Sequence, residues 1–346
     1  MTDTLQPVDL PTTTSSTPVT SPVCAVVVTR GRTPYLATTL AALAAQSRPP
    51  LRVLLVDVGR DADPSVETFL QSTFAGVGGS PTPALRLVHT PGARTFGHAV
   101  RRALEADDAV ATTWLWLLHD DSAPAPGALS ELVRAVAHAP SVAVAGAKQR
   151  TWTDPERLLE VGLRSSLSGR RMTDVEPGEL DQGQHDGRDD VLAVGIAGAL
   201  VRREVWELLG GTDPLLGPFG DGFDLSRRAR LAGHRVIVVP SAVVRHAQAG
   251  YLGLRSTAPD SGGVPVDRDG DGEDDRADPR RSFAARRRAL VHSRLVSAPP
   301  PLVPLVAVMA LLAAVVRSLG QLAAKQPGLA VDEVRAALAA LARPDG

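Results

Sequence analysis

From Val23 onward, short continuous runs of Val and Leu alternate with longer segments rich in Ala and Leu. A short apolar run without polar alternation is typical of a strand buried on both faces of a sheet. The longer segments place apolar residues at helical spacing. Together they predict an α/β domain with a mostly parallel sheet flanked by helices. Strands are expected at 23–29, 51–58, 84–90, 112–120 and 142–150, and helices at 33–46, 64–74, 97–106 and 127–139.

The pattern is less regular further along the chain. A polar stretch at 164–190 has no clear period and predicts a surface loop. Residues 191–211 are expected to form a strand followed by a helix that ends at a pair of glycines. Another helix is expected at 224–234, and residues 235–247 predict a pair of short strands.

Composition changes on both sides of this α/β region, which we place at 22–255. Residues 1–21 are rich in Thr, Ser and Pro and lack the features of a signal peptide, so a disordered tail is expected. Residues 256–282 are acidic and rich in Gly, and predict a flexible insertion or linker. Inside it, 267–278 has the spacing of a Ca²⁺ loop, but Asp274 replaces the usual apolar residue. A solvated acidic segment is therefore preferred.

Residues 283–346 predict basic and apolar C-terminal helices. They include the most apolar stretch of the chain, Leu302 to Val316, which follows the basic segment "AARRRALVHSRL". This stretch is short for a spanning helix of about 20 residues, and it carries Pro304. A membrane-associated or re-entrant helix, a soluble helix packed on the domain and a true span all stay open.

Charge and cysteine content narrow the possible functions. The formal net charge of −1 gives no global reason to expect binding to nucleic acid or to an anionic membrane. The single cysteine, Cys24, excludes an intrachain disulfide and a Cys-rich metal site, and its apolar surroundings predict a buried core residue. Any chemistry that depends on charge must therefore be local.

Polar clusters stand at the carboxyl ends of predicted strands, where open parallel sheets bind ligands. If these strands are parallel neighbours, the clusters converge on one rim. Aspartates and histidines on such a rim suit Mg²⁺ or Mn²⁺. For Asp120 and Asp121, capping of the helix near Gly127 and simple solvation are the alternatives. The clusters are "TRGR" (29–32), "DVG" (57–59), "HDDS" (119–122) and "RHA" (245–247).

Longer motifs occur around these clusters in a fixed order: "VVVTRGRTPYLATTLAALAAQS", "VLLVDVGRD", "LLHDDSAPAPGAL" and "GIAGALVRREVWELLGGTDPLLGPFGDGFDLSRRARLAGHRVIVVPSAVVRHA". In this order they resemble the family 2 inverting glycosyltransferases of the GT-A fold, of an actinobacterial, membrane-associated type, over roughly residues 23–250. The resemblance implies a GT-A-like (Rossmann-like) domain that transfers a sugar from a nucleotide diphosphate sugar.

The resemblance also implies a metal site for Mn²⁺ or Mg²⁺. His119 takes the first acidic place of the family's metal-binding D-x-D motif, Asp120 the middle place and Asp121 the second acidic place. His246 aligns with the histidine that closes the metal site from the far strand. A histidine at the first place suits Mn²⁺ better than Mg²⁺.

Donor-binding residues follow from the same alignment. Asp57 matches the aspartate that contacts the nucleobase, although Val58 stands where the family usually has Asn or Asp. Asp120 is grouped with the residues expected around the donor. The loop after the first strand is expected to line the nucleotide through Thr29, Arg30 and Arg32.

Inversion by single displacement needs a general base on the acceptor hydroxyl. The segment "FGDGFDL" supplies Asp221 as first choice and Asp224 as second. The family commonly has Glu-Asp, one residue, then Asp, so Gly222 leaves the usual base position without a side chain. Asp224 also has an alternative as the helix N-cap.

These motifs lead to a metal-dependent inverting glycosyltransferase as the expected function. The expected acceptor is a glycan or lipid-linked molecule of the cell envelope, and the C-terminal helices would hold the enzyme on the cytoplasmic side of the plasma membrane. Two other classes stay open: an inactive nucleotide- or glycan-binding module, and a nucleotidyltransferase. The single glycine in "TRGRTPYL" disfavours the nucleotidyltransferase.

Overall fold

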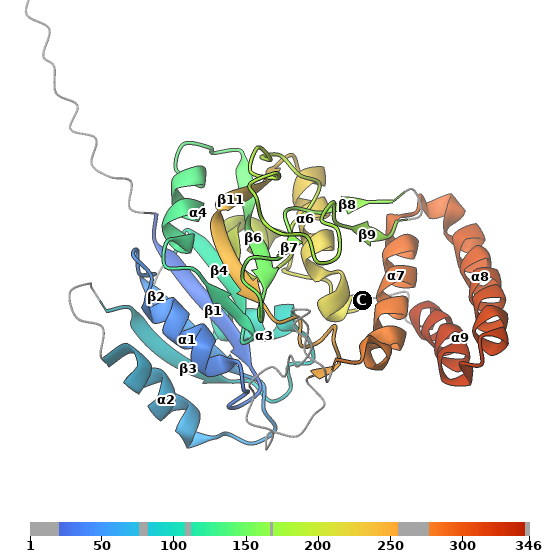
Figure 1. Ribbon diagram of the computed structural model, residues 1–346, viewed down its shortest axis with the longest axis horizontal. Helices are drawn as coiled ribbons and strands as arrows, with labels where there is room; N and C mark the ends of the chain where they lie inside the picture. Colours follow the sequence, from blue (N-terminus) through green and yellow to red (C-terminus); the bar gives the residue numbers. More distant parts are fainter. Residues whose placement is uncertain (1–20, 76–81, 108–111, 167–168, 255–276, 343–346) are drawn as a thin grey trace, which may run out of the picture.

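The computed structural model describes residues 21–75, 82–107, 112–166, 169–254 and 277–342. A mixed nine-stranded sheet forms the centre of the fold, and helices cover both of its faces (Figure 1). The strands of this sheet are β1 (Val23–Thr29), β2 (Arg52–Asp57), β3 (Ala84–His89), β4 (Trp114–His119), β5 (Ser122–Pro124), β6 (Val142–Thr151), β7 (Leu158–Glu160), β10 (Ala199–Arg202) and β11 (Arg235–His246). Its helices are α1 (Leu36–Ala44), α2 (Pro64–Ala75), α3 (Phe96–Glu105), α4 (Ala128–Val136), α5 (Arg203–Leu208) and α6 (Asp221–Leu231).

The sheet confirms the predicted α/β class. Its strand order is β3-β2-β1-β4-β10-β6-β11-β5, with β7 paired to β6 off this path. Strands β3, β2, β1 and β4 are all parallel, and β6 and β11 are parallel to each other. The short strand β10 lies between these two groups and is antiparallel to both of its neighbours. The order of the elements therefore predicted the parallel parts of the sheet but not the insertion of β10.

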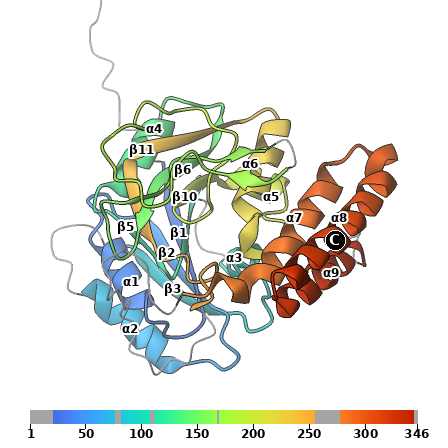
Figure 2. The same cartoon turned by 45° about the vertical axis from the view of Figure 1, so that its right-hand side comes forward.

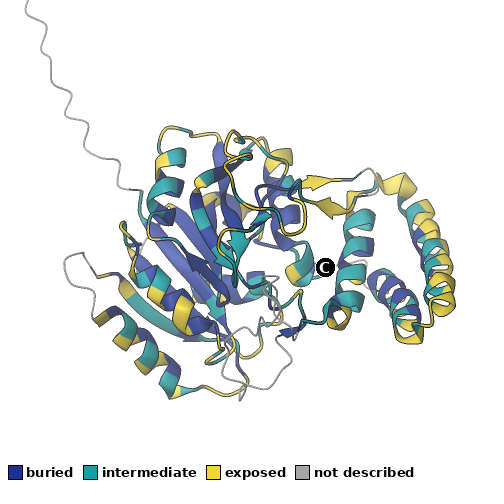
Figure 3. Ribbon diagram, in the orientation of Figure 1, coloured by how far each residue is buried: buried dark blue, intermediate teal, exposed yellow. Residues whose placement is uncertain are grey.

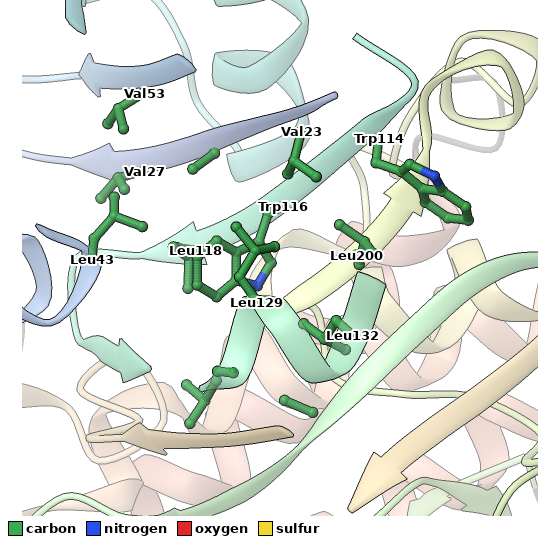
Figure 4. Packing of buried hydrophobic residues seen from close by; sticks show 14 of the residues in the cluster. Val23, Val27, Leu43, Val53, Trp114, Trp116, Leu118, Leu129, Leu132 and Leu200 are labelled. Carbon is green, nitrogen blue, oxygen red and sulfur yellow. The ribbon is translucent and has the colours of Figure 1, made fainter. Parts of the chain in front are cut away.

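Each face of the sheet has its own hydrophobic core. On one face, side chains of β1, β2 and β4 pack against α1, α2 and α4; Trp116, Leu118 and Leu129 are among the buried residues seen in Figure 4. On the other face, α3, α5 and α6 contribute residues such as Val100, Trp206 and Leu225. Cys24 is a buried free thiol in this second core, as predicted.

Two of the predicted strands are wrong in detail. No strand begins at residue 191; β10 starts at Ala199, because the preceding segment turns toward α6, where the Val194 N–H donates to the Ser226 hydroxyl. Residues 235–247 do not form two short strands. They form the single strand β11, and its register on β6 shifts between Val239 and Val243, around Pro240, which has no N–H to donate.

The described residues of the polar stretch at 164–190 form an excursion from the sheet. It begins with a small hairpin, β8 (Arg164–Ser165) and β9 (Arg171–Met172). Further along, Asp181 contacts the buried Lys148 ammonium at 2.9 Å and also pairs with Arg150 of β6. These ion pairs attach the excursion to the sheet beside the carboxyl end of β6.

The chain ends in a three-helix unit beside the α/β domain, made of α7 (Phe283–Ser297), α8 (Val303–Ala323) and α9 (Pro327–Leu341) (Figures 1 and 2). Glu333 of α9 is completely buried in this unit and pairs with Arg287 and Arg317. His292 of α7 joins the unit to the α/β domain through Asp213 at 2.8 Å. Residues 1–20 of the predicted N-terminal tail (1–21) and residues 256–276 of the predicted acidic segment (256–282), with most of its Ca²⁺-loop pattern, lie outside the described residues.

Candidate active site

A cavity of about 610 Å³ opens at the carboxyl ends of β1 and β4. Its wall draws on the loop after β1, the loop before α3, the end of β11 and the first turn of α6. Most of the residues singled out in the sequence line it, namely Thr29, Arg30, Arg32, His119, Asp121, Asp221 and His246. Asp57, Asp120 and Asp224 are not in its wall. The structure therefore gathers the predicted clusters at one rim.

The route by which His246 reaches this rim differs from the expectation. Strand β11 is not a neighbour of β4, because β10 and β6 lie between them. After His119 the chain turns back into β5, which pairs antiparallel with β11, so that Ser122 lies opposite His246. This reversal, rather than neighbouring parallel strands, brings the last cluster beside Asp121.

His119, Asp121 and His246 converge at the floor of the cavity. The Asp121 Oδ1 atom lies 3.9 Å from His119 Nδ1 and 3.6 Å from His246 Nε2. One potential ligand atom from each residue lies within 4.8 Å of the other two, and the carboxylate is almost fully buried. Two imidazole nitrogens and one carboxylate oxygen form a donor set suited to a borderline divalent cation. The residues present therefore fit a metal site.

The backbone around β11 fixes the orientation of the Asp121 carboxylate. The Ala249 N–H donates to Asp121 Oδ2 at 2.8 Å, and the Ala247 N–H donates to the Asp121 carbonyl at 3.0 Å. With Oδ2 held on this side, Oδ1 is the oxygen that faces the two histidines. Helix capping is excluded as the role of Asp121, because α4 begins after Gly127 with no side-chain cap.

Asp120 points away from the cavity and ties elements together. Its Oδ2 accepts a hydrogen bond from the Thr29 hydroxyl at 3.2 Å, and its carbonyl accepts one from the Thr39 hydroxyl of α1 at 2.7 Å. Asp120 is completely buried, so the solvated alternative is wrong for it. Its contacts hold the ends of β1 and β4 in register beneath the cavity.

Asp57 supports the loop that carries two arginines of the cavity wall. Its Oδ1 accepts hydrogen bonds from the N–H groups of Gly31 and Gly59, both at 2.8 Å. Gly31 has φ of +65°, a conformation that favours glycine. The side chain of Asp57 is buried, so in this structure it shapes the loop around Arg30 and Arg32 from behind.

Asp221, the first choice as base, is a carboxylate in the wall of the cavity. It begins α6, is 5% exposed, and its Oδ1 accepts the Gly222 N–H at 2.7 Å. Its Oδ2 has no hydrogen-bond partner within the part of the chain that the structure describes. Burial raises the pKa of Asp221 to about 6, although the hydrogen bond from the Gly222 N–H and the nearby charge of Arg171 act to lower it. A carboxylate with this pKa is suited to accept a proton near neutral pH.

Asp224 lies one turn further along α6 and outside the cavity wall. It is not the helix N-cap, because α6 starts at Asp221 after Gly220. Its Oδ2 pairs with Arg228 at 2.7 Å, and that guanidinium also donates to the carbonyls of Leu209 and Gly211. Burial raises the pKa of Asp224, and the charge of Arg228 opposes the shift. Between the two candidate bases, the geometry favours Asp221.

Gly222 has no side chain because no space exists for one. A Cβ atom at this position would lie 2.6 Å from the Ile196 nitrogen and 2.7 Å from the Val194 oxygen, both of which are backbone atoms. The first turn of α6 therefore packs directly on the 194–196 segment. The missing side chain at the family's usual base position is a consequence of this close packing.

We expect Gly222→Ala to lower the free energy of unfolding by about 3 kcal/mol, since backbone must move to admit the methyl group. Gly127→Ala is the matched control, because nothing lies within 4 Å of its added Cβ. Chemical denaturation of both variants measures the difference. Equal stabilities would show that the 194–196 backbone moves to admit the methyl group without lowering the free energy of unfolding.

Other residues of the cavity wall escaped the sequence analysis. Arg94, in the loop between β3 and α3, could have been found as one more polar cluster after a predicted strand. Gln149 was visible only as a polar residue in a strand. Arg171 gave no usable signal, because the β8–β9 hairpin brings it to the cavity from a stretch without periodicity. It pairs there with the buried Glu160.

Comparisons with known proteins agree with this fold. The sequence model of the "Glycosyltransferase like family 2" matches residues 21–257. Galactofuranosyltransferase GlfT1 of Mycolicibacterium smegmatis is 34% identical over 221 residues, which cover 62% of this chain and 67% of the relative.

Solved structures share the fold at low identity. GalNAc-T7 with UDP, GalNAc and Mn²⁺ gives a TM-score of 0.51 at 15% identity, over 65% of this chain; the match covers only 43% of GalNAc-T7. Mannosyltransferase PcManGT from Pyrobaculum calidifontis, in complex with GDP-Man and Mn²⁺, gives a TM-score of 0.50 at 19% identity, over 94% of this chain and 75% of that one.

The fold is therefore that of the GT-A glycosyltransferases. The chain belongs to glycosyltransferase family 2 and is a nucleotide-sugar glycosyltransferase. Membership of this family confirms the predicted class and decides against a nucleotidyltransferase and a non-catalytic module.

Proposed function

We propose that the chain transfers a sugar from a nucleoside diphosphate sugar to an acceptor hydroxyl, with inversion, using Mn²⁺ or Mg²⁺ held by His119, Asp121 and His246. The observation that carries this proposal is that the His-Asp-His cluster and the buried Asp221 line the same cavity. One end supplies cation ligands for a diphosphate, and the other supplies a base for the acceptor.

The donor end of the cavity is basic. Arg30, Arg32 and Arg94 line it, and their charges would balance the diphosphate. Arg32 is held in place by stacking over the Phe69 ring of α2 at 4.9 Å, which lowers the entropy cost of binding an anion. When bound, a divalent cation would neutralise charge on the leaving diphosphate as the glycosyl bond breaks.

On the acceptor side, Asp221 takes the proton. The acceptor oxygen attacks the anomeric carbon, its proton passes to the Asp221 carboxylate, and the bond from that carbon to the diphosphate oxygen breaks. The products are the glycoside, the protonated Asp221 and the free nucleoside diphosphate. Because attack comes from the face opposite the leaving group, the anomeric configuration inverts.

The relative from Mycolicibacterium smegmatis suggests which sugar to test first. GlfT1 is a galactofuranosyltransferase, so we propose a galactofuranosyl donor and a cell-envelope glycan or lipid-linked acceptor. A thermal-shift screen of nucleoside diphosphate sugars with Mn²⁺ present tests the donor. We expect the galactofuranosyl donor to raise the melting temperature more than the mannosyl donor does. A screen in which no donor shifts the transition would contradict the proposal.

We also propose that the enzyme works on the cytoplasmic side of the plasma membrane and contacts it through α8. Within the described residues, Pro300–Ala323 is long and apolar enough to cross a bilayer; an 18-residue stretch of it has a mean hydropathy of 2.3, and only 11% of that stretch is buried. Its exposed apolar side chains recur at helical spacing along one face: Leu305, Val308, Met309, Leu312, Val315, Val316, Leu319 and Leu322. This face is the exposed edge of the C-terminal unit in Figure 3. The free thiol of Cys24 fits a reducing compartment.

The contacts on the inner face of α8 favour a helix that lies in the membrane interface over a helix that crosses the bilayer. Ala310 and Ala314 are buried in the three-helix unit, and Arg317 pairs with the buried Glu333 at 3.0 Å. A spanning α8 would have to leave this unit and expose the Arg317 charge to lipid, at a cost of several kcal/mol. An α8 lying in the interface keeps both the ion pair and the apolar contact.

Exchanging Leu305 and Leu312 for Asp should reduce co-sedimentation with anionic lipid vesicles at least tenfold, because each leucine buried in the interface contributes about 1.5 kcal/mol or more. Leu208→Asp with Leu231→Asp is the matched control, since these leucines are 73% and 74% exposed on the α/β domain. If wild type stays in the supernatant, or both sets sediment equally, α8 is not the membrane contact.

A further inference from the structure

A buried glutamine lies directly behind one of the proposed metal ligands. Gln149, near the end of β6, is 3% exposed. Its Oε1 lies 3.1 Å from His246 Nδ1, and its Nε2 donates to the Ala197 carbonyl at 3.0 Å. The other nitrogen of the same imidazole, Nε2, is the one that faces Asp121 Oδ1 at 3.6 Å.

The partners of Gln149 decide which way its amide points. The Ala197 carbonyl can only accept a hydrogen bond, so the amide nitrogen must face it. The amide oxygen then faces His246, and since it too can only accept, Nδ1 of His246 must carry the proton. A neutral imidazole has one N–H, so the lone pair of Nε2 is directed to the side where Asp121 lies.

We propose that Gln149 is a positioning residue that holds His246 in the Nδ1–H tautomer, with Nε2 ready to bind the divalent cation. This inference rests on the metal site proposed above. An outer partner of this kind fixes the ring orientation of a ligating histidine and strengthens its binding to the metal.

Neighbouring residues reserve the space that Gln149 needs. A Cβ atom on Gly195 would lie 2.7 Å from Gln149 Nε2 and 2.8 Å from Glu160 Oε1. Glu160, opposite Gln149 on β7, accepts the Gly195 N–H at 2.5 Å and so keeps this glycine in place. The glutamine therefore lies in a slot whose walls are fixed by backbone and by a second buried polar side chain.

Two substitutions separate the hydrogen bond from the volume of the side chain. Gln149→Met keeps the length and removes the acceptor, whereas Gln149→Glu keeps an acceptor for Nδ1–H. Gln46→Met is the matched control, because Gln46 is equally buried and hydrogen-bonded but lies outside the cavity wall. The readouts are the ¹⁵N chemical shifts of His246 in the metal-free full chain and the Mn²⁺ dissociation constant from calorimetry.

At a pH where the imidazole is neutral, we expect metal-free wild type to show a protonated Nδ1 and an unprotonated Nε2 on His246. Gln149→Met should populate the other tautomer and weaken Mn²⁺ binding by about 10- to 100-fold. Gln149→Glu and Gln46→Met should keep the wild-type tautomer and bind Mn²⁺ within a few-fold of wild type.

A neutral wild-type His246 with its proton on Nε2 instead of Nδ1 overturns the inference even if Gln149→Met does not fold. Equal Mn²⁺ affinity of wild type and folded Gln149→Met overturns it as well. Failure of wild type to bind Mn²⁺ contradicts the proposed metal site instead, and the tautomer measured without metal still decides the role of Gln149.

Discussion

Asp121→Asn is expected to lose turnover by about 10³-fold and to bind Mn²⁺ at least 100-fold more weakly. The substitution keeps the shape of the side chain and can still accept the Ala249 N–H. It places an uncharged amide, with N–H donors, where Oδ1 faces His119 and His246. A site that has lost its anionic ligand competes less well with water for a divalent cation.

Paired measurements of Mn²⁺ affinity and steady-state turnover check this result. Asp332→Asn on α9 is the control, because it removes the same charge far from the cavity. An Asp121→Asn enzyme that binds Mn²⁺ like wild type would remove Asp121 from the metal site. One that loses Mn²⁺ but keeps full turnover would show that transfer does not need the cation.

Asp221→Asn is expected to lower kcat by about 10²- to 10⁴-fold, the usual contribution of a general base. The same variant should be more stable than wild type at pH 8. The folded-state pKa of Asp221, about 6, is above the ordinary value of 3.8, so folding favours the protonated acid. The stabilising effect of this raised pKa on wild type is complete below pH 3.8 and is lost as pH rises through 6. At pH 8 the buried charge of Asp221 lowers the free energy of unfolding of wild type by up to about 3 kcal/mol. The neutral amide of the variant has no such cost.

The control for Asp221→Asn is Asp224→Asn. It breaks the pair with Arg228, which also holds the 209–211 turn, so it should lose stability while keeping turnover. Wild-type kcat at saturating Mn²⁺ should rise with pH as Asp221 loses its proton, with a midpoint near pH 6. A large kcat loss in Asp224→Asn, together with normal kcat in Asp221→Asn, would show that Asp224 is the general base and Asp221 is not.

Much of this fold could be predicted from the sequence because its signals are local. Continuous apolar runs marked β1, β2, β3, β4 and β6. The carboxyl end of each parallel strand was a sound place to look for polar side chains, and those after β1 and β4 do line the cavity. The ordered motifs then added what single clusters could not, since each cluster alone had an ordinary explanation as a loop or a cap.

What escaped prediction depends on contacts between distant segments. The reversal from β4 into β5, which brings His246 to Asp121, rests on a three-residue strand too short to give a periodic signal. The close approach of Gly222 to the 194–196 backbone was also invisible, so its missing side chain read as a catalytic defect. Gln149 carried no signal because its role depends on which imidazole nitrogen it meets.

The central claim is that one cavity binds both a nucleoside diphosphate sugar and a divalent cation for transfer. Its most direct test is the release of nucleoside diphosphate from a galactofuranosyl donor by the full chain, measured with Mn²⁺ and again with excess chelator. We predict release that requires the cation, increases with an acceptor present and falls about 10³-fold in Asp121→Asn. Release that is unchanged by the chelator and by Asp121→Asn would contradict the account.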